Sequence, residues 1–267
     1  MSEAARLDAE APVLLRDDRD SVCTLTLNRP QARNALSEAM LEALQGTLDE
    51  IAEDRTVRAV VLASTGPAFC AGHDMREMRA QPSEDYYREL FGRSSRVMLS
   101  IMRLPQPVIA MVHATATAAG SQLVGSCDLA VASEHAFFAT PGVHIGLFCS
   151  TPMVALSRNV GRKRAMEMLL TGEMMSAQEA AEIGLINRAV PDYQLDSEVA
   201  AICRLVVSKS PHVIKVGKEA FYRQLEMGVE EAYEYTAAVM ARNMMASDAV
   251  EGIDAFLAKR DPVWEDR

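Results

Sequence analysis

The middle of this chain is almost free of charged residues. Leu104–Ser157 spans 54 residues, and only Asp128 and Glu134 in it are charged. Because 24% of the whole chain is charged, about 13 charged residues would be expected over this length. Prolines and glycines interrupt the segment at eight places, so it predicts no membrane-spanning helix. An uncharged but interrupted segment of this kind indicates a protein interior that surrounds a binding site.

The balance of charge excludes several classes of partner. Lys and Arg number 27 against 37 Asp and Glu, which gives a formal net charge of −10 at pH 7. A chain this acidic is not expected to bind nucleic acid or anionic membranes. The five histidines include no His-x-x-x-His or Glu-x-x-His pair, so no metal site is predicted.

Cysteine usage and the N-terminus predict the compartment. The five cysteines are odd in number and form no Cys-x-x-Cys pair, which argues against a disulfide framework and favours a reducing compartment. The first residues contain no basic segment followed by an apolar run, so no signal peptide is expected. These two observations predict a cytoplasmic location.

Strands and helices are predicted to alternate along the first 195 residues. The apolar, β-branched segments 21–28, 58–64, 107–113 and 128–133 are typical of strands, the last three of them buried. The helical spacing of apolar residues predicts helices over 34–54 and 86–103. Such alternation predicts an α/β protein with a mainly parallel sheet. From Asp196 to Lys259 nearly every residue is expected to be helical, so we divide the chain into a core, 12–195, and a helical region, 196–267.

Five segments, in order, resemble the enoyl-CoA hydratase/isomerase (crotonase) superfamily. They are Leu27–Leu36 (LNRPQARNAL), Pro67–Met78 (PAFCAGHDMREM), Pro107–Asp128, Gly184–Pro191 (GLINRAVP) and Glu251–Trp264 (EGIDAFLAKRDPVW). The resemblance covers roughly residues 12–265. It implies a spiral of ββα units, a C-terminal helical trimerisation region, and an acyl-CoA or enoyl-CoA thioester as substrate. It also implies a homotrimer or a dimer of trimers, and no cofactor other than the coenzyme A of the substrate.

The resemblance places the chemistry in two tight turns. A thioester becomes an enolate-like anion when its α-carbon is attacked or deprotonated, and two backbone N–H groups aimed at the thioester oxygen stabilise that charge. By position, the two amides of this oxyanion hole fall on Ala71 and Ala119. The second turn is expected to begin a helix at about Gly120, with the positive end of the helix dipole facing the oxyanion.

The same resemblance suggests residues that hold coenzyme A. The family places the adenine against the first turn, here Ala71, Gly72 and Asp74. Arg29 or Arg33, and Lys259 or Arg260 near the C-terminus, are candidate partners of the phosphates, with Arg33 and Lys259 preferred.

The two glutamates used by hydratases of the family are missing. By alignment, their positions fall on Gln122 and Gly142. Glutamine cannot exchange a proton near pH 7, and glycine has no side chain. His144 follows Gly142 by two residues and has a side-chain type suited to acid–base catalysis. A partly exposed structural histidine is the simpler interpretation of His144, and Cys149 is expected to be a buried wall residue.

One leading hypothesis and two alternatives therefore stay open. The leading hypothesis is an acyl-CoA thioester protein of this family that stabilises a thioester enolate, with weak or no hydratase activity. The first alternative is another CoA-thioester enzyme, an isomerase, hydrolase or decarboxylase, that uses His144 or ordered water. The second is a non-catalytic acyl-CoA-binding protein.

Overall fold

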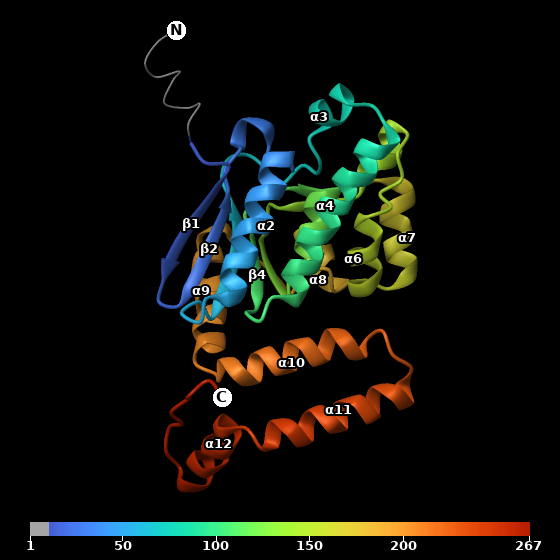
Figure 1. The fold of residues 1–267 in the computed structure, drawn as a ribbon. Coiled ribbons are helices and arrows are strands. Elements are labelled where there is room, and N and C mark those ends of the chain that lie inside the picture. Colours follow the sequence, from blue (N-terminus) through green and yellow to red (C-terminus); the bar gives the residue numbers. More distant parts are fainter. Residues whose placement is uncertain (1–10) are drawn as a thin grey trace.

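The computed structural model describes residues 11–267, and its centre is a six-stranded, mostly parallel sheet (Figure 1). The strand order is β1-β2-β3-β4-β6-β9, in which β1 and β2 are antiparallel and all later neighbours are parallel. The bounds are β1 Leu14–Arg19, β2 Val22–Leu27, β3 Ala59–Ser64, β4 Val108–Val112, β6 Leu129–Ser133 and β9 Arg188–Val190. The prediction of an α/β fold with a mainly parallel sheet is confirmed.

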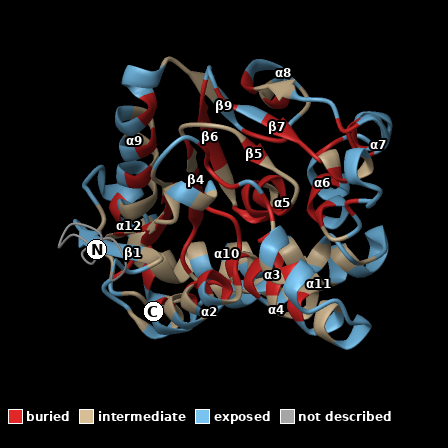
Figure 2. Cartoon of the chain, turned by 90° about the horizontal axis from the view of Figure 1, so that it is seen from above, coloured by how far each residue is buried: buried red, intermediate tan, exposed pale blue. Residues whose placement is uncertain are grey.

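Side chains of the central strands point alternately into two cores. On one face, Val60 and Leu62 of β3 pack in the larger core with helices α2 (Glu38–Glu53) and α4 (Glu84–Arg103). On the other face, Val61 packs beneath α9 (Leu195–Val207). Figure 2 shows both layers, with the buried residues gathered along the strands and the inner sides of the helices. Burial on both faces explains why β3 is an unbroken apolar run.

The edge strand β1 has no apolar pattern, and the sequence analysis did not predict it. Its sequence is LLRDDR, and almost all of it is exposed. It pairs in antiparallel register with β2, from Leu14 opposite Leu27 to Arg19 opposite Val22. Charged side chains are typical of a sheet edge, where they hinder pairing with another chain.

A second, three-stranded sheet lies beside the first. Its order is β5-β7-β8, formed by β5 Ala116–Thr117, β7 Phe137–Ala139 and β8 Met175–Ser176. Helix α5 (Ala119–Ser126) leaves β5 after one residue, so this small sheet fixes where α5 begins. The capping box of Ser176 and Glu179 opens α8 (Ala177–Glu182).

The remaining helices lie on the outside of the sheets and in the C-terminal region. They are α3 Met75–Ala80, α6 Pro152–Asn159, α7 Arg162–Thr171, α10 Pro211–Gln224, α11 Val229–Met244 and α12 Ser247–Ala258. The prediction of nearly continuous helix from Asp196 to Lys259 is confirmed. In Figure 1, α10 to α12 lie below the core, at the end opposite α3. No helix within residues 11–267 is long and apolar enough to cross a membrane.

A buried ion pair holds α10 against the core. Lys218 donates to Asp128 at 2.6 Å and to the carbonyls of Ile101 and Gln106 at 3.0 Å. The Asp128 carboxylate also accepts the Tyr222 hydroxyl at 2.9 Å and the Val108 amide at 2.7 Å. Burial lowers the pKa of Lys218, and the nearby Asp128 carboxylate works in the opposite direction. One of the two charges in the uncharged segment is therefore part of the scaffold.

Candidate active site

The two glycine-containing turns are in direct contact. Asn34 holds the first turn, because its amide donates to the carbonyls of Thr65 at 2.7 Å and Ala68 at 2.9 Å. A Cβ added to Gly120 would lie 2.1 Å from the carbonyl oxygen of Cys70, so only glycine allows this approach. A Cβ added to Gly72 would lie 3.0 Å from the Cβ of Ala118. The structure thus brings together the two segments that the sequence analysis selected.

The first turn of α5 presents a free backbone donor. Ala118 precedes the helix with φ 51° and ψ −117°, a conformation that L-residues rarely adopt. It is held there by its amide, which donates to the Ala139 carbonyl at 2.9 Å. The Ala119 amide is the first of the helix and has no acceptor among residues 11–267. Backbone strain such as that of Ala118 is typical of functional sites. Here it places the unpaired Ala119 amide where the two turns meet.

The Ala71 amide is engaged in the fold. It donates to the Arg33 carbonyl at 3.0 Å, although the Ala71 residue itself is exposed. Arg33 has φ 51°, in the left-handed region, and its side chain is exposed beside the turn. Gly72 follows with φ 100°, which favours glycine. Ala71 as the second oxyanion donor stays a prediction, and a thioester oxygen there would have to share or replace the bond to Arg33.

Asp74 uses its carboxylate to begin α3. It accepts the Arg76 amide at 3.0 Å and pairs with the Arg29 guanidinium at 3.0 Å. Burial opposes ionisation, but these donors prevail and the pKa of Asp74 lies below its usual range. The Arg29 guanidinium is therefore neutralised by Asp74 and is not available to pair with a phosphate. The Asp74 carboxylate already accepts hydrogen bonds from Arg29 and Arg76, so a ligand would contact it in addition to these two partners.

The positions of the two missing glutamates differ in the side chain and the space that the structure provides there. Gln122 lies on α5 and is only 5% exposed, and its Oε1 finds no partner within the described chain. Gly142 is buried, and an added Cβ would lie 2.7 Å from the Leu147 carbonyl and 2.9 Å from Cys149 Sγ. The second position therefore has no room for any side chain in this backbone.

The His144 ring lies against the end of α7. It lies in the 3-10 segment Pro141–Ile145, is exposed, and its Nε2 is 2.8 Å from the Thr171 carbonyl at the end of α7. This contact agrees with the simpler interpretation of His144 as a structural histidine. An acid–base role for His144 stays a prediction. Cys149 is buried, and burial raises the pKa of its thiol even though a hydrogen bond from Gly142 works against it.

The candidate cations near the C-terminus lie far from the turns within one chain. Arg260 makes two bonds to Glu251, at 2.6 and 2.7 Å. Lys259 is exposed at the end of α12, in the left-handed conformation. Figure 1 places α12 at the opposite end of the molecule from α3, which follows the first turn. The end of α12, where Lys259 lies, is therefore on the side of the molecule away from the first turn.

His73 lies in the first turn of the candidate site, although it was not among the residues predicted from the sequence. It lies between Gly72 and Asp74, and its ring packs edge-on against Phe91 of α4, with centroids 5.2 Å apart. Its Nε2 is buried and has no hydrogen-bond partner in the part of the chain that the structure describes. Burial lowers the pKa of His73 to about 4, so the ring is neutral at pH 7.

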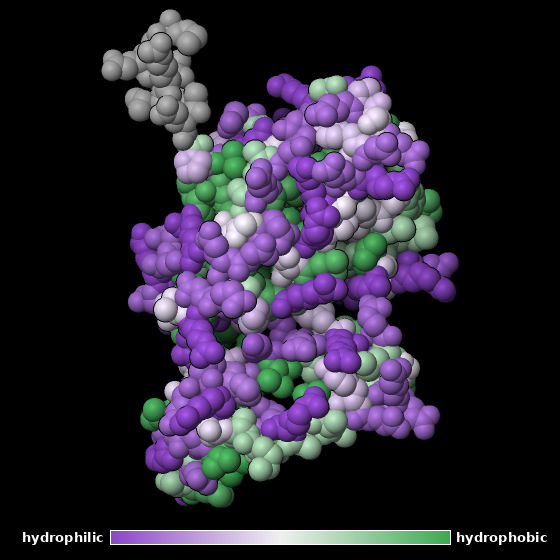
Figure 3. Space-filling model, in the orientation of Figure 1, coloured by the Kyte–Doolittle hydropathy of each residue, from purple (hydrophilic) through white to green (hydrophobic). Residues whose placement is uncertain are grey.

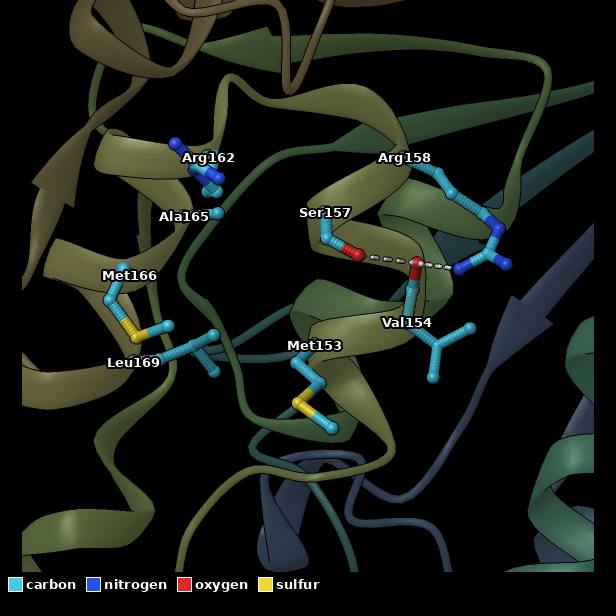
Figure 4. A pocket seen from close by; sticks show the side chains of 8 residues that line it. All are labelled: Met153, Val154, Ser157, Arg158, Arg162, Ala165, Met166 and Leu169. Atoms are coloured by element: carbon cyan, nitrogen blue, oxygen red, sulfur yellow. Dashed lines mark hydrogen bonds between the residues drawn. The ribbon is translucent and has the colours of Figure 1, made fainter. Parts of the chain in front are cut away.

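A separate apolar hollow lies between α6 and α7 (Figure 4). Its volume is about 420 Å³, and Met153, Val154, Met166 and Leu169 contribute apolar side chains to it. Arg158 lies at its edge, where it pairs with Glu226 from the end of α10 at 3.0 Å. None of the predicted site residues lines this hollow.

Comparison with known proteins identifies the family of the chain. The sequence model of the enoyl-CoA hydratase/isomerase family matches residues 17–267. The chain belongs to this family. A crystal structure of an enoyl-CoA hydratase from Mycobacterium smegmatis is 58% identical, with a TM-score of 0.94, and the match covers 95% of this chain and 99% of that one. This match confirms the predicted crotonase-like fold.

A second relative comes from human. Human enoyl-CoA hydratase domain-containing protein 3, mitochondrial, is 46% identical over 98% of this chain and 86% of its own length. Its crystal structure has a TM-score of 0.92, and the match covers 94% of this chain and 100% of that one.

The names of the relatives contradict the predicted location. The human, rat and mouse relatives, each 46% identical, are named mitochondrial proteins. The expectation of a cytoplasmic protein is therefore wrong. It rested on cysteine usage and on the lack of a secretory signal, and both observations bear only on oxidising, secretory compartments. A second reducing compartment satisfies them equally well.

Proposed function

We propose that this family member binds an acyl-CoA thioester and stabilises its enolate at the N-terminus of α5. The observation that carries the proposal is the unpaired Ala119 amide, held by the strained Ala118 and in contact with the Gly72 turn. A developing oxyanion would gain from this donor and from the helix dipole behind it. Coenzyme A enters as part of the substrate.

We propose further that the reaction is not the two-glutamate hydration of an enoyl thioester. Hydration needs one group to deprotonate water and another to protonate the α-carbon. Gln122 cannot exchange a proton near pH 7, and Gly142 offers no side chain and no space for one. The alternative reactions differ in what they need from the protein: a decarboxylase forms the enolate without a base, an isomerase moves one proton with a single group, and a hydrolase has to activate an ordered water. The absence of space at Gly142 also favours the second candidate, a non-catalytic acyl-CoA-binding protein.

Self-association would complete the phosphate site. Helix α11 has no buried residue, and Phe221, Val229, Tyr233, Met240 and Phe256 are all more than half exposed. Figure 3 shows apolar side chains gathered over this C-terminal part. An apolar surface of this extent is typical of a protein–protein interface. A homotrimer, or a dimer of trimers, would cover it and would bring Lys259 of a second copy toward the coenzyme A phosphates for which Arg33 is the candidate partner in its own chain.

One experiment tests the binding proposal and the hydration proposal together. Butyryl-CoA added to the purified protein should raise Tm by mass action, and a crystal soaked with it should place the thioester oxygen at the Ala119 amide. Crotonyl-CoA should be hydrated far more slowly than by a family member that has both glutamates. Butyryl-CoA that leaves Tm unchanged would refute the binding site, and rapid hydration would refute the second proposal.

A further inference from the structure

His73 is the one ionisable side chain of the two turns that is free to exchange a proton near pH 7. The first turn contains three ionisable residues, Cys70, His73 and Asp74. The Cys70 thiol is completely buried, and burial raises its pKa to about 12. The Asp74 carboxylate is already paired with Arg29 and caps α3. On the other side of the contact, residues 116–126 of β5 and α5 include no ionisable side chain.

A parallel β-bridge with Leu36 fixes the backbone of His73 beside the first turn of α5. The Leu36 amide donates to the Gly72 carbonyl at 2.8 Å, and the Leu36 carbonyl accepts the Asp74 amide at 3.1 Å. A Cβ added to Gly72 would lie 3.5 Å from the Ala119 nitrogen. Because consecutive Cα atoms are about 3.8 Å apart, the Cα of His73 lies within about 9 Å of that nitrogen. A thioester that is bonded to the Ala119 amide is therefore within reach of the His73 side chain.

The His73 ring has a nitrogen that makes no hydrogen bond. The ring packs edge-on against Phe91 of α4, with centroids 5.2 Å apart, and α4 packs on α5. Nε2 is buried and has no hydrogen-bond partner among residues 11–267. Burial alone lowers the pKa of the ring to about 4, and no carboxylate or cation of the described chain contributes to this shift. Since buried polar groups are paired in nearly all proteins, an unpaired ring nitrogen in this turn indicates a group that bonds to the substrate.

From this arrangement we propose that His73 is the proton-transfer residue of the site, and that its Nε2 takes a proton from the α-carbon of the bound thioester and returns it to the substrate. The inference rests on the proposed function, because the thioester oxygen has to lie at the Ala119 amide. In the first step the α C–H bond breaks, its electron pair forms the enolate, and the proton passes to Nε2.

A 3-enoyl thioester allows this step to complete a reaction. The negative charge of its enolate extends to the γ-carbon. Return of the proton from Nε2 to that carbon moves the double bond from C3 to C2 and restores the neutral ring. Substrate and product are isomers, so the reaction consumes no water and needs neither of the two missing glutamates.

The neutral state of the ring suits this role. An unprotonated imidazole has the lone pair that accepts the α-proton. The imidazolium that forms is stabilised by the enolate charge beside it, because opposite charges attract more strongly in a buried site than in water. A glutamine at the same position would keep a polar side chain but could not accept the proton.

Isomerisation of 3-butenoyl-CoA to crotonyl-CoA, followed by proton NMR, tests the proposal. The wild-type protein should catalyse it, and His73→Gln should be slower by about 100-fold or more. The affinity of His73→Gln for butyryl-CoA, measured by calorimetric titration, should stay within about threefold of the wild type. Wild-type protein that binds butyryl-CoA but does not isomerise 3-butenoyl-CoA would overturn the role of His73 and leave the proposed binding standing. Failure of both thioesters to bind would overturn both proposals.

Two further histidine variants locate the activity. His135→Gln is the matched control, because His135 is exposed and follows β6 on the surface. It should change neither the rate nor the affinity. A loss of isomerisation in His144→Gln, with the rate retained in His73→Gln, would overturn the assignment to His73.

The pH dependence of the wild-type reaction decides even if His73→Gln does not fold. The ratio kcat/KM reports the ionisation of groups in the free enzyme. Because the pKa of His73 is lowered to about 4, kcat/KM should stay level between about pH 8 and about pH 5.5. A decline with a midpoint at about 6.5, the usual pKa of a solvated histidine, would assign the proton transfer to another residue and overturn the proposal.

Discussion

Substitution of Gly120 by alanine tests whether the two turns must touch. The new Cβ would lie 2.1 Å from the Cys70 carbonyl oxygen, whereas real Cβ atoms essentially never approach closer than 3.0 Å. The turns therefore have to separate by about 0.9 Å or more. That carbonyl also accepts the Thr117 amide at 2.9 Å, so the shift strains the link to β5.

The expected cost follows from these contacts. Overpacking costs about 1–3 kcal/mol, and a weakened backbone hydrogen bond adds about 1 kcal/mol. The higher helix propensity of alanine offsets about 1 kcal/mol of this loss in the free energy of unfolding. We expect a net loss of about 2 kcal/mol, which in a chain of this size lowers Tm by about 4–8 °C. Because the Ala119 amide moves with the turn, the rise in Tm caused by butyryl-CoA should also shrink.

Differential scanning calorimetry at fixed protein concentration measures both effects. Gly46→Ala on α2 is the matched control, because an added Cβ there has no neighbour within 4 Å. That control should raise the stability by about 0.5–1 kcal/mol through helix propensity alone. If Gly120→Ala were as stable as Gly46→Ala and still responded fully to butyryl-CoA, the close contact of the turns would not matter and the reasoning would fail.

Two further predictions concern buried ionisable groups. Because burial lowers the pKa of His73 to about 4, the unfolded chain binds a proton that the folded chain does not between that value and about 6.5. Acidification across this window should lower the free energy of unfolding by up to about 3 kcal/mol. Urea unfolding at several pH values should show that His73→Phe loses less of this free energy than the wild type does. Identical pH profiles for the two proteins would contradict the lowered pKa of His73. Lys218→Met leaves Asp128 without its ion pair and should cost about 3 kcal/mol, whereas Tyr222→Phe removes one 2.9 Å hydrogen bond and should cost about 1 kcal/mol. Thermal denaturation at one protein concentration compares them, and equal losses would be inconsistent with a buried ion pair.

Much of the scaffold could be predicted from the sequence because it depends on local patterns. Apolar runs such as 107–113 gave the buried strands, and helical spacing gave α2 and α4, although α2 begins after its cap Ser37 rather than at Asn34. The segments Pro67–Met78 and Pro107–Asp128 were recognised by their order and spacing, which resemble those of the family. The charged strand β1 was missed, because its place in the sheet depends on its pairing with β2 and not on burial.

The details of the candidate site depend on contacts between distant segments. The sequence alone determined that a small-residue site lies in an uncharged interior and that Gln122 and Gly142 stand where two glutamates are usual. Only the tertiary structure decided that Ala71 is engaged by Arg33, that Gly142 has no space for a side chain, and that His144 turns toward α7. It also decided that Gln122 Oε1 on α5 is buried and has no hydrogen-bond partner in the described chain. The sequence determines which polar groups the chain contains. The close packing of distant segments determines which of these groups stay without a hydrogen-bond partner, because that packing decides which groups come within reach of one another.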